Sequence, residues 1–144
     1  PIILLTGLSL YEKKYKVLKQ YTCISLVLAI LRCLFYSTTI LPDPSTVCNY
    51  RPTLDKQMLL NLLYKGTCHD LIFSGHASIV FLTWKFLEEN FGVQPYVGLI
   101  HQVVMIFSMM TLRKHYSIDV IVAYLITHYV YNNKEPITNF FDLD

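Results

Sequence analysis

The chain contains few charged residues. Only 15% of its 144 residues are Asp, Glu, Lys or Arg, whereas 53% are hydrophobic, and an average soluble domain carries about a quarter charged residues. The formal net charge is only +2, so the composition does not indicate a nucleic-acid partner. It predicts instead a membrane protein, long enough for about four or five spans of roughly 20 residues each.

Several other signals are absent. No Cys-x-x-Cys pair occurs and the histidines are not grouped with the cysteines, so the sequence predicts no zinc site. No basic segment precedes the apolar residues 1–10, and no secretory signal peptide is recognisable. The chain starts without methionine, partway into an apolar stretch. We therefore expect an N-terminally truncated fragment that forms one membrane-embedded domain over residues 1–144.

Apolar segments separated by turn residues predict an all-α fold, a polytopic transmembrane helix bundle. Four segments are apolar and long enough to be full spans: residues 21–41, 70–87, 96–112 and 116–131. Residues 1–10 form a partial fifth span. The lysines of residues 11–20 place that segment on the cytosolic side. Residues 42–68 form a loop with a helical pattern over residues 54–64, and residues 132–144 form a polar tail.

His76, His115 and Asp119 lie in or beside these apolar segments. An ionisable group inside a span costs roughly 2.5–3.5 kcal/mol on insertion scales, and by default it indicates a functional site. His115 and Asp119 are four residues apart, so on a helix they share one face. The carboxylate can accept the imidazole Nδ1–H and leave Nε2 as a nucleophile or base. Following the crossings places His76 at the same non-cytosolic face, where it can be the complementary acid.

Other polar residues have a structural interpretation as well as a functional one. Arg32 lies inside a predicted span and is costly unless it pairs with a carboxylate or with a lipid phosphate, and both partners stay open. We interpret His101 and His128 as packed, hydrogen-bonded residues. Cys48 and Cys68 flank the outer loop and either form a disulfide or remain two free thiols. Three tyrosines suggest an interfacial belt: Tyr124, Tyr129 and Tyr131.

The two histidine segments resemble motifs of the sphingomyelin synthase family, a lipid-phosphate-phosphatase-like branch. Residues 68–76, Cys-His-Asp-Leu-Ile-Phe-Ser-Gly-His, are similar to its Cys-Gly-Asp…Ser-Gly-His-Thr motif, with His69 for the glycine and Ala77 for the threonine. Residues 115–124 resemble its His-Tyr-Thr-x-Asp-Val motif. A looser match to Arg-Cys…Thr-Thr-Leu-Pro comprises Arg32-Cys33, Thr38-Thr39 and Leu41-Pro42. The resemblance covers residues 19–131.

The resemblance implies a phospholipid:ceramide head-group transferase that needs no cofactor and no metal ion. It implies that His115 attacks phosphorus to form a phosphohistidine intermediate and that Asp119 orients His115. It implies that His76 protonates the leaving diacylglycerol oxygen and then deprotonates the ceramide hydroxyl. The expected partners are membrane lipids: ceramide as acceptor, a glycerophospholipid as donor and diacylglycerol as product. The expected location is an endomembrane (Golgi or ER) or the plasma membrane, with the site on the lumenal or exterior face.

Five further residues are substrate-binding candidates under this resemblance. Ser74 can donate to a phosphate oxygen, and Tyr116 can face a choline ammonium group. Arg32 can bind the phosphate. Asp70 is a second carboxylate near His76 but fits a helix N-cap equally well. Arg113 can attract the phosphate, although interfacial anchoring explains it equally well.

Lipid phosphate phosphatases are the main alternative. Their motifs resemble Lys-x6-Arg-Pro, Pro-Ser-Gly-His and Ser-Arg-x5-His-x3-Asp. Here Pro44 stands at the lysine of the first motif, Phe73 at the proline of the second, and Met109 at the arginine of the third. The missing basic residues bind a phosphate dianion, so their absence favours a phosphodiester substrate. A diacylglycerol-accepting transferase and a catalytically inactive relative are further alternatives. The donor head group, whether choline, ethanolamine or inositol, stays open.

Overall fold

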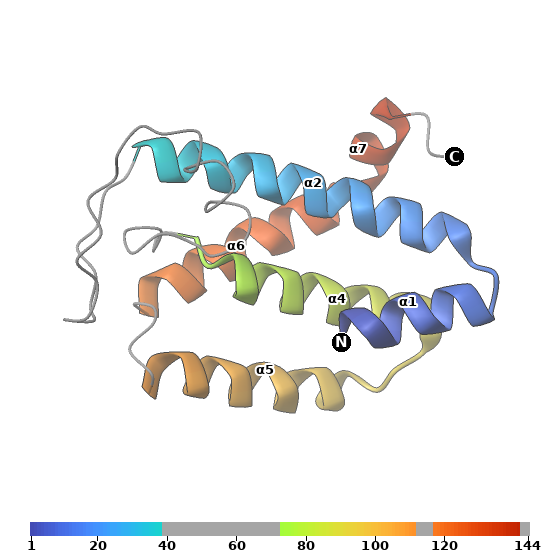
Figure 1. The fold of residues 1–144 in the computed structure, drawn as a ribbon, viewed down its shortest axis with the longest axis horizontal. Helices are drawn as coiled ribbons and strands as arrows, with labels where there is room; N and C mark the ends of the chain where they lie inside the picture. The colour runs from blue at the N-terminus through green and yellow to red at the C-terminus, as the bar shows by residue number, and fades with distance from the viewer. Residues whose placement is uncertain (39–72, 112–116, 142–144) are drawn as a thin grey trace.

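The structure, a computed structural model, describes residues 1–38, 73–111 and 117–141 (Figure 1). Every regular element in these ranges is an α-helix, as predicted, and the order is α1 (Ile2–Tyr11), α2 (Tyr15–Thr38), α4 (Gly75–Phe91), α5 (Pro95–Thr111), α6 (Ser117–Asn132) and α7 (Lys134–Phe140). The predicted loop over residues 42–68, with its helix over residues 54–64, lies outside the described residues.

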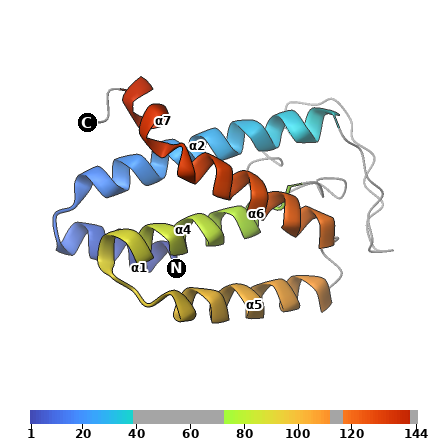
Figure 2. The same cartoon turned by 180° about the vertical axis from the view of Figure 1, so that it is seen from behind.

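Helix α4 is the centre of the bundle. It packs against α1, α2, α5 and α6, and Figures 1 and 2 show it between α5 on one side and the pair of α2 and α6 on the other. The chain direction alternates between α2, α4 and α5, and α6 runs in the same direction as α4 (Figure 1). The start of α4, the start of α6 and the ends of α2 and α5 therefore lie at one end of the bundle, here called the motif end.

Burial along α4 explains its central place. Eight of its 17 residues are buried, and they recur at helical spacing on more than one face. Leu82 and Phe86 are fully buried, and the ring of Tyr21 from α2 meets Phe86 edge-on at 5.6 Å. The Tyr21 hydroxyl also lies 3.1 Å from the Thr83 hydroxyl in a buried hydrogen bond. Each large apolar side chain buried in this way contributes about 1.5–3 kcal/mol.

One described helix is long and apolar enough to cross a membrane. Residues Tyr15–Phe35 of α2 meet that criterion, and only 28% of the most apolar window is buried inside the structure. A core helix of a soluble protein would be mostly buried, so this exposure agrees with a membrane location. Helices α4, α5 and α6 have 17, 17 and 16 residues. The predicted count of about four full spans is therefore not confirmed by the described residues.

Helix α5 has the composition of a lipid-facing helix. It contains no Asp, Glu, Lys or Arg, and several large apolar side chains on it are exposed, with Phe107 at 69%. Exposed apolar surface of this extent indicates contact with a membrane or with another apolar partner. Gly98 is the buried residue of α5 and lies against Trp84 of α4.

Three helix boundaries differ from the sequence prediction. Helix α2 begins at Tyr15, six residues before the predicted span, so part of the lysine-rich segment is helical. Helix α4 begins at Gly75 instead of residue 70, because Ser74 is its N-cap, and it continues past residue 87 to a left-handed C-cap at Gly92. The predicted polar tail contains helix α7. Pro136 lies in the first turn of α7, where a missing backbone N–H costs little.

A polar cluster closes the end of the bundle opposite the motif end. The Glu89 carboxylate of α4 accepts hydrogen bonds from the Tyr131 hydroxyl of α6 and from Lys134 Nζ of α7. The Lys134 ammonium lies 4.4 Å from the centroid of the Tyr131 ring, and the Tyr131 hydroxyl also contacts the Lys85 carbonyl at 3.3 Å. Tyr131 is buried, so its assignment to an interfacial belt was wrong. The cluster joins three helices.

We predict that a methyl group added at Gly98 separates α4 from α5. A Cβ there would lie 3.2 Å from Trp84 ring atoms, and Trp84 is buried and hydrogen-bonded to His101. Gly7→Ala is the matched control, because it gains the same helix propensity with no atom within 4 Å of the new Cβ. Gly98→Ala should be about 1–3 kcal/mol less stable than Gly7→Ala. Thermal unfolding in detergent measures the difference, and equal stabilities would contradict this packing.

We also predict a stability loss at acidic pH that depends on Glu89. Burial raises the pKa of this carboxyl, but hydrogen bonds from Lys134 and Tyr131 and the Lys134 charge outweigh burial and leave the pKa below its ordinary value of 4.5. The contribution of the Glu89 carboxylate to the free energy of unfolding is therefore complete above pH 4.5. It is lost as the pH falls through the lowered pKa of the folded state. Glu89 is about half exposed, so solvent screening limits the effect to about 0.2–1 kcal/mol.

The measurement is the unfolding midpoint of the wild type and of Glu89→Gln between pH 3 and pH 7. Glu89→Gln should have the lower unfolding midpoint at neutral pH. The midpoints of the two proteins should become equal at the acid end of the range. A constant difference across the whole range would show that the carboxylate charge is not what stabilises the cluster. Glu135→Gln is the control, because Glu135 is an exposed carboxylate on the first turn of α7.

Candidate functional site

A backbone hydrogen bond joins the two histidine segments. The Ser74 N–H, immediately before α4, donates to the Asp119 carbonyl in the first turn of α6 at 3.3 Å. The two residues are 45 positions apart in the sequence. His76 is the second residue of α4, so the described parts of the Ser-Gly-His and Asp-Val motifs meet at the motif end. The predicted convergence of His76 with His115 stays a prediction, because His115 lies outside the described residues.

Ser74 shapes the start of α4. Its side-chain oxygen accepts the Ala77 N–H at 3.4 Å as an N-cap, and its carbonyl accepts the Ser78 hydroxyl at 3.0 Å. Ser74 and Ser78 are both almost completely buried. An N-cap satisfies one of the backbone donors that the first turn of a helix leaves unpaired. Ser74 therefore has a structural role in addition to the phosphate contact predicted for it.

Phe73 has a backbone conformation that few residues adopt. Its φ is +71°, in the left-handed region, which is a genuine outlier for a bulky residue. The side chain is buried and packs against the ring of Phe35 from α2, with centroids 6.0 Å apart. Proline fixes φ near −65°, so it cannot occupy this position in this conformation.

Asp119 and His76 differ in exposure. The Asp119 side chain is completely buried, whereas His76 is exposed. Asp119 lies in the first turn of α6, where the unpaired N–H groups and the helix dipole stabilise a negative charge. The burial of the Asp119 carboxylate and the exposure of the His76 imidazole suit two different roles. The carboxylate can hold a fixed orientation, while the imidazole can reach a substrate and exchange protons with it.

Arg32 approaches this end of the bundle from α2. A Cβ atom built on Gly75 would lie 2.5 Å from Arg32 Nη1 and 3.0 Å from Arg32 Cζ. The guanidinium therefore lies against the backbone of Gly75, between Ser74 and His76 in the sequence. Any side chain at position 75 would displace it. The two predicted partners for Arg32, a carboxylate and a lipid phosphate, both stay open.

The remaining predicted site residues lie outside the described residues: Asp70, Arg113, His115, Tyr116, and the cysteine pair Cys48 and Cys68. Helix α5 ends at Thr111 and α6 begins at Ser117, both at the motif end. The helical relation between His115 and Asp119 stays a prediction. Within the described ranges, no three side chains among His, Cys, Asp and Glu could hold a metal ion together. The prediction of a metal-free site is not tested by that observation.

The other two described histidines are exposed, and each makes a hydrogen bond and a ring contact, which agrees with part of the prediction. His101 Nδ1 accepts the indole N–H of Trp84 at 3.1 Å, and the two rings are tilted against each other. His128 stacks on Tyr124 with an interplanar angle of 12° and lies 3.0 Å from the Asn132 amide nitrogen. Both histidines interact with neighbouring side chains away from the Ser74–Asp119 contact.

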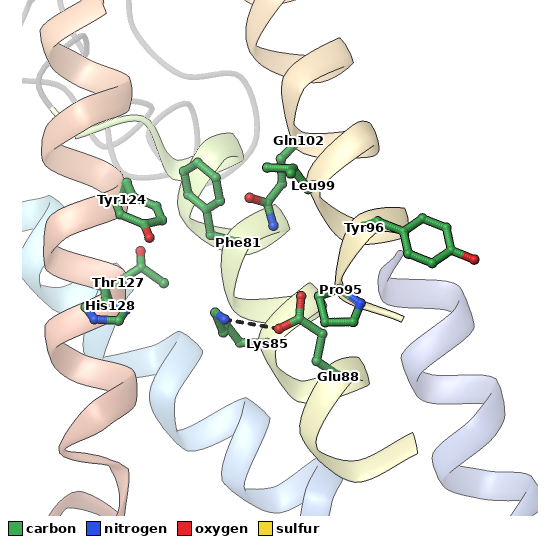
Figure 3. Close-up of a pocket in the computed structure, with 10 residues that line it drawn as sticks. All are labelled: Phe81, Lys85, Glu88, Pro95, Tyr96, Leu99, Gln102, Tyr124, Thr127 and His128. Carbon is green, nitrogen blue, oxygen red and sulfur yellow. Dashed lines mark hydrogen bonds and ion pairs between the residues drawn. The ribbon is translucent and has the colours of Figure 1, made fainter. Parts of the chain in front are cut away.

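The structure also contains a cavity that sequence reasoning missed. It has a volume of about 370 Å³ and lies between α4, α5 and α6 (Figure 3). Its lining combines apolar and polar side chains: Phe81, Lys85, Glu88, Pro95, Tyr96, Leu99, Gln102, Tyr124, Thr127 and His128. Lys85 and Glu88 form an ion pair of 3.0 Å across its wall. Phe81 and Tyr124 each follow a motif residue by five positions, so the cavity begins about 7.5 Å along the helices from the motif end.

Helical spacing was the available signal for this cavity. Tyr124, Thr127 and His128 share a face of α6, and Phe81, Lys85 and Glu88 share a face of α4. Either group alone is equally typical of a packed interface. The cavity depends on where α5 lies relative to α4 and α6. The sequence pattern does not specify that position.

The chain is similar to one described protein family and to several curated proteins. Residues 67–135 match the family described as PAP2 superfamily C-terminal. Phosphatidylcholine:ceramide cholinephosphotransferase 1 is 29% identical over 149 residues in both Rattus norvegicus and Homo sapiens, covering 87% of this chain and 36% of the relative. Phosphatidylcholine:ceramide cholinephosphotransferase 2 of Rattus norvegicus is 30% identical over 119 residues, covering 69% and 33%.

These matches confirm the resemblance predicted from the motifs. The chain spans about a third of the length of the curated relatives that it matches. No solved structure matches the chain significantly.

We predict that Phe73→Pro disrupts the contact between α4 and α6, because proline cannot adopt the left-handed φ at this position. Phe73→Leu is the control, since it keeps an apolar side chain and, unlike proline, has no ring that fixes φ. The proline variant should be less stable than the leucine variant by more than about 1 kcal/mol. Thermal unfolding in detergent measures this difference. A proline variant as stable as the leucine variant would show that residue 73 does not need a positive φ.

Proposed function

We propose that this chain, whose residues 67–135 match the PAP2 superfamily C-terminal family, is the catalytic region of a lipid phosphotransferase acting on ceramide. The reaction class is supported by the distant similarity to the ceramide cholinephosphotransferases. The observation that carries the proposal is the 3.3 Å hydrogen bond from the Ser74 N–H to the Asp119 carbonyl. It brings two motif segments, far apart in the sequence, to one end of the bundle.

In the first proposed step, the head group leaves the donor lipid. Nε2 of His115 attacks the phosphorus of a glycerophospholipid, and the bond from phosphorus to the diacylglycerol oxygen breaks. His76, as imidazolium, gives its proton to that oxygen, so diacylglycerol leaves as a neutral alcohol. Asp119 accepts the other ring N–H of His115 and stabilises the positive charge that forms there. The product of this step is a phosphohistidine that still carries the head-group alcohol.

In the second proposed step, ceramide takes the head group. The now neutral His76 removes the proton from the primary hydroxyl of ceramide as its oxygen attacks phosphorus. The phosphorus–nitrogen bond breaks and restores His115, while His76 is again protonated for the next cycle. The phosphoryl head group therefore moves from one lipid to another, and one phosphodiester replaces another with no change in total charge or in the oxidation state of phosphorus. Holding both lipids and the histidines in line supplies most of the rate enhancement in such a reaction.

The surroundings of the site suit lipid substrates. Helices α2 and α5 both reach the motif end and carry exposed apolar side chains along their length. Exposed apolar helices next to a polar end allow donor and acceptor to keep their chains in the bilayer while their head groups meet the histidines. We place the site on the non-cytosolic face, because the lysines within residues 11–20 predict that this segment is cytosolic.

A head-group transfer assay tests the proposal. The protein, expressed with any natural sequence that flanks this chain, is incubated in microsomes with fluorescent ceramide and one donor at a time: phosphatidylcholine, phosphatidylethanolamine or phosphatidylinositol. One donor should give a new polar sphingolipid. His115→Ala should abolish the product, and His76→Ala should reduce the rate by about 10²–10⁴-fold, as expected for a lost general acid.

His101→Ala is the matched control, because His101 also lies on an apolar helix but is packed against Trp84. It should keep most of the activity. Phosphate release from phosphatidic acid without any sphingolipid product would replace the transferase by a phosphatase with water as acceptor. Product formed from diacylglycerol instead of ceramide would keep the mechanism and change the acceptor. Full activity of His115→Ala would contradict the proposed nucleophile.

A further inference from the structure

We propose that the cavity between α4, α5 and α6 is a second lipid site, which binds an uncharged single-chain lipid with a hydroxyl head, such as a monoacylglycerol. The inference does not rest on the proposed function, because it depends on the shape and chemistry of the cavity and not on the histidine motifs. The cavity has a volume of about 370 Å³, within the range of small-molecule sites, roughly 300–1,000 Å³.

The polar part of the cavity lies away from the motif end. Thr127 follows Asp119 by eight positions on α6, and Lys85 follows His76 by nine positions on α4. At the rise of an α-helix, these separations are about 12–14 Å along the helix axes. A lipid whose head group binds at Thr127 therefore cannot present the same head group to His76. The cavity is a separate site, and its ligand is not a lipid in the act of head-group transfer.

A buried hydroxyl in the cavity wall has no hydrogen-bond partner among the described residues. Thr127 lines the cavity and is 2% exposed, and its Oγ1 is the unpaired atom. Other hydroxyls on these helices donate to the carbonyl four positions earlier, as Thr83 does to Ile79 at 2.6 Å. An unsatisfied buried hydroxyl costs free energy, so it indicates a partner that the chain itself does not supply. A hydroxyl or carbonyl of a bound ligand would be that partner.

Further uncharged polar groups face the same space. Figure 3 shows the Gln102 amide of α5 and the Tyr124 hydroxyl of α6 directed into the cavity, as Thr127 is. A ligand hydroxyl can donate to one of these groups and accept from another. The groups come from two helices that both pack against α4. One ligand head can therefore connect α5 to α6.

The charged groups of the lining are already paired. Lys85 Nζ lies 3.0 Å from Glu88 Oε2 in an ion pair. The Asn132 amide nitrogen, which can only donate, lies 3.0 Å from His128 Nε2, so that ring nitrogen accepts and carries no proton. A charged ligand head would pair with one member of the ion pair and leave the other without its partner. The lining therefore selects an uncharged head.

Apolar side chains form the body of the site. Phe81 is buried, whereas Tyr96 and Leu99 are both 60% exposed and lead from the cavity onto the apolar surface of α5. A lipid can therefore enter from the bilayer. A methylene group occupies about as much space as a water molecule in the liquid, roughly 30 Å³, so the cavity accommodates about twelve such groups. That size fits most of a lipid with one chain of medium length and excludes a second long chain.

Photoaffinity labelling tests the site directly. The protein, with any natural sequence that flanks this chain, is reconstituted in phosphatidylcholine nanodiscs and irradiated with monodecanoylglycerol that carries a diazirine in its chain. Mass spectrometry should find saturable labelling in residues 95–102 and 124–128. Unlabelled monodecanoylglycerol should compete at concentrations about tenfold lower than decanesulfonate or decyltrimethylammonium, the size expected for one lost interaction of a charged group. Equal competition by all three amphiphiles would contradict an uncharged head.

Substitutions at Thr127 test the hydrogen bond. Thr127→Val replaces the hydroxyl by a methyl group, so it should weaken binding of monodecanoylglycerol by about three- to tenfold, the range for one neutral hydrogen bond. Thr127→Ser keeps the hydroxyl and should bind more tightly than Thr127→Val. Without ligand, Thr127→Val should unfold at a temperature no lower than the wild type, because it removes an unpaired hydroxyl. A lower unfolding midpoint would show that Oγ1 has a partner within the protein and would contradict the assignment.

A substitution at the mouth tests the cavity itself. Leu99→Trp should fill the mouth and reduce the saturable labelling. Val103→Trp is the matched control, because Val103 lies one turn later on α5, is 57% exposed and is outside the lining. Equal labelling of the two variants, or no saturable labelling of the wild type, would overturn the inference. None of these measurements uses head-group transfer, so a failure of the proposed function would leave the result unchanged.

Discussion

The junction between Ser74 and Asp119 is the interaction on which the rest of this structure depends. It is a backbone hydrogen bond between two helix starts, and such groups must be satisfied within the protein where no water can reach them. The junction fixes where α4 begins and how α6 enters the bundle. The described motif residues Ser74, His76 and Asp119 lie at it or within two residues of it. His76 follows Ser74 by two positions, Asp119 supplies the carbonyl, and Arg32 contacts the glycine in between.

The local conformation at this junction separates the chain from the phosphatase pattern. Phe73 adopts a left-handed φ while fully buried, and residues in such conformations persist only where the surrounding structure holds them. Packing against Phe35 and the cap formed by Ser74 provide that support. Gly75 admits the guanidinium of Arg32. The same short segment thus sets a backbone turn, a helix start and the approach of a cation, which links the fold directly to the chemistry proposed for it.

The sequence predicted the helical fold, because that follows from apolar periodicity, and the meeting of His76 with His115 stays a prediction from counting chain reversals. It did not predict the start of α4 at Gly75, since the apolar run begins earlier and no propensity indicates the unusual φ of Phe73. Helix α7 was missed because Pro136 and polar residues resemble a tail. The buried hydroxyl of Tyr131 and the cavity beside Tyr124 depend on how separate helices pack, which no local pattern contains.

The central claim is that both histidines face one site at the motif end, and cysteine cross-linking tests it most directly. In a background with the native cysteines replaced by serine, one variant carries His76→Cys with His115→Cys, and the control carries His101→Cys with His115→Cys. His101 lies ten residues before the end of α5, about 15 Å along the helix from the motif end. A short bifunctional thiol reagent should link the first pair and not the second. No link in the first pair, or equal linking in both, would contradict a shared site.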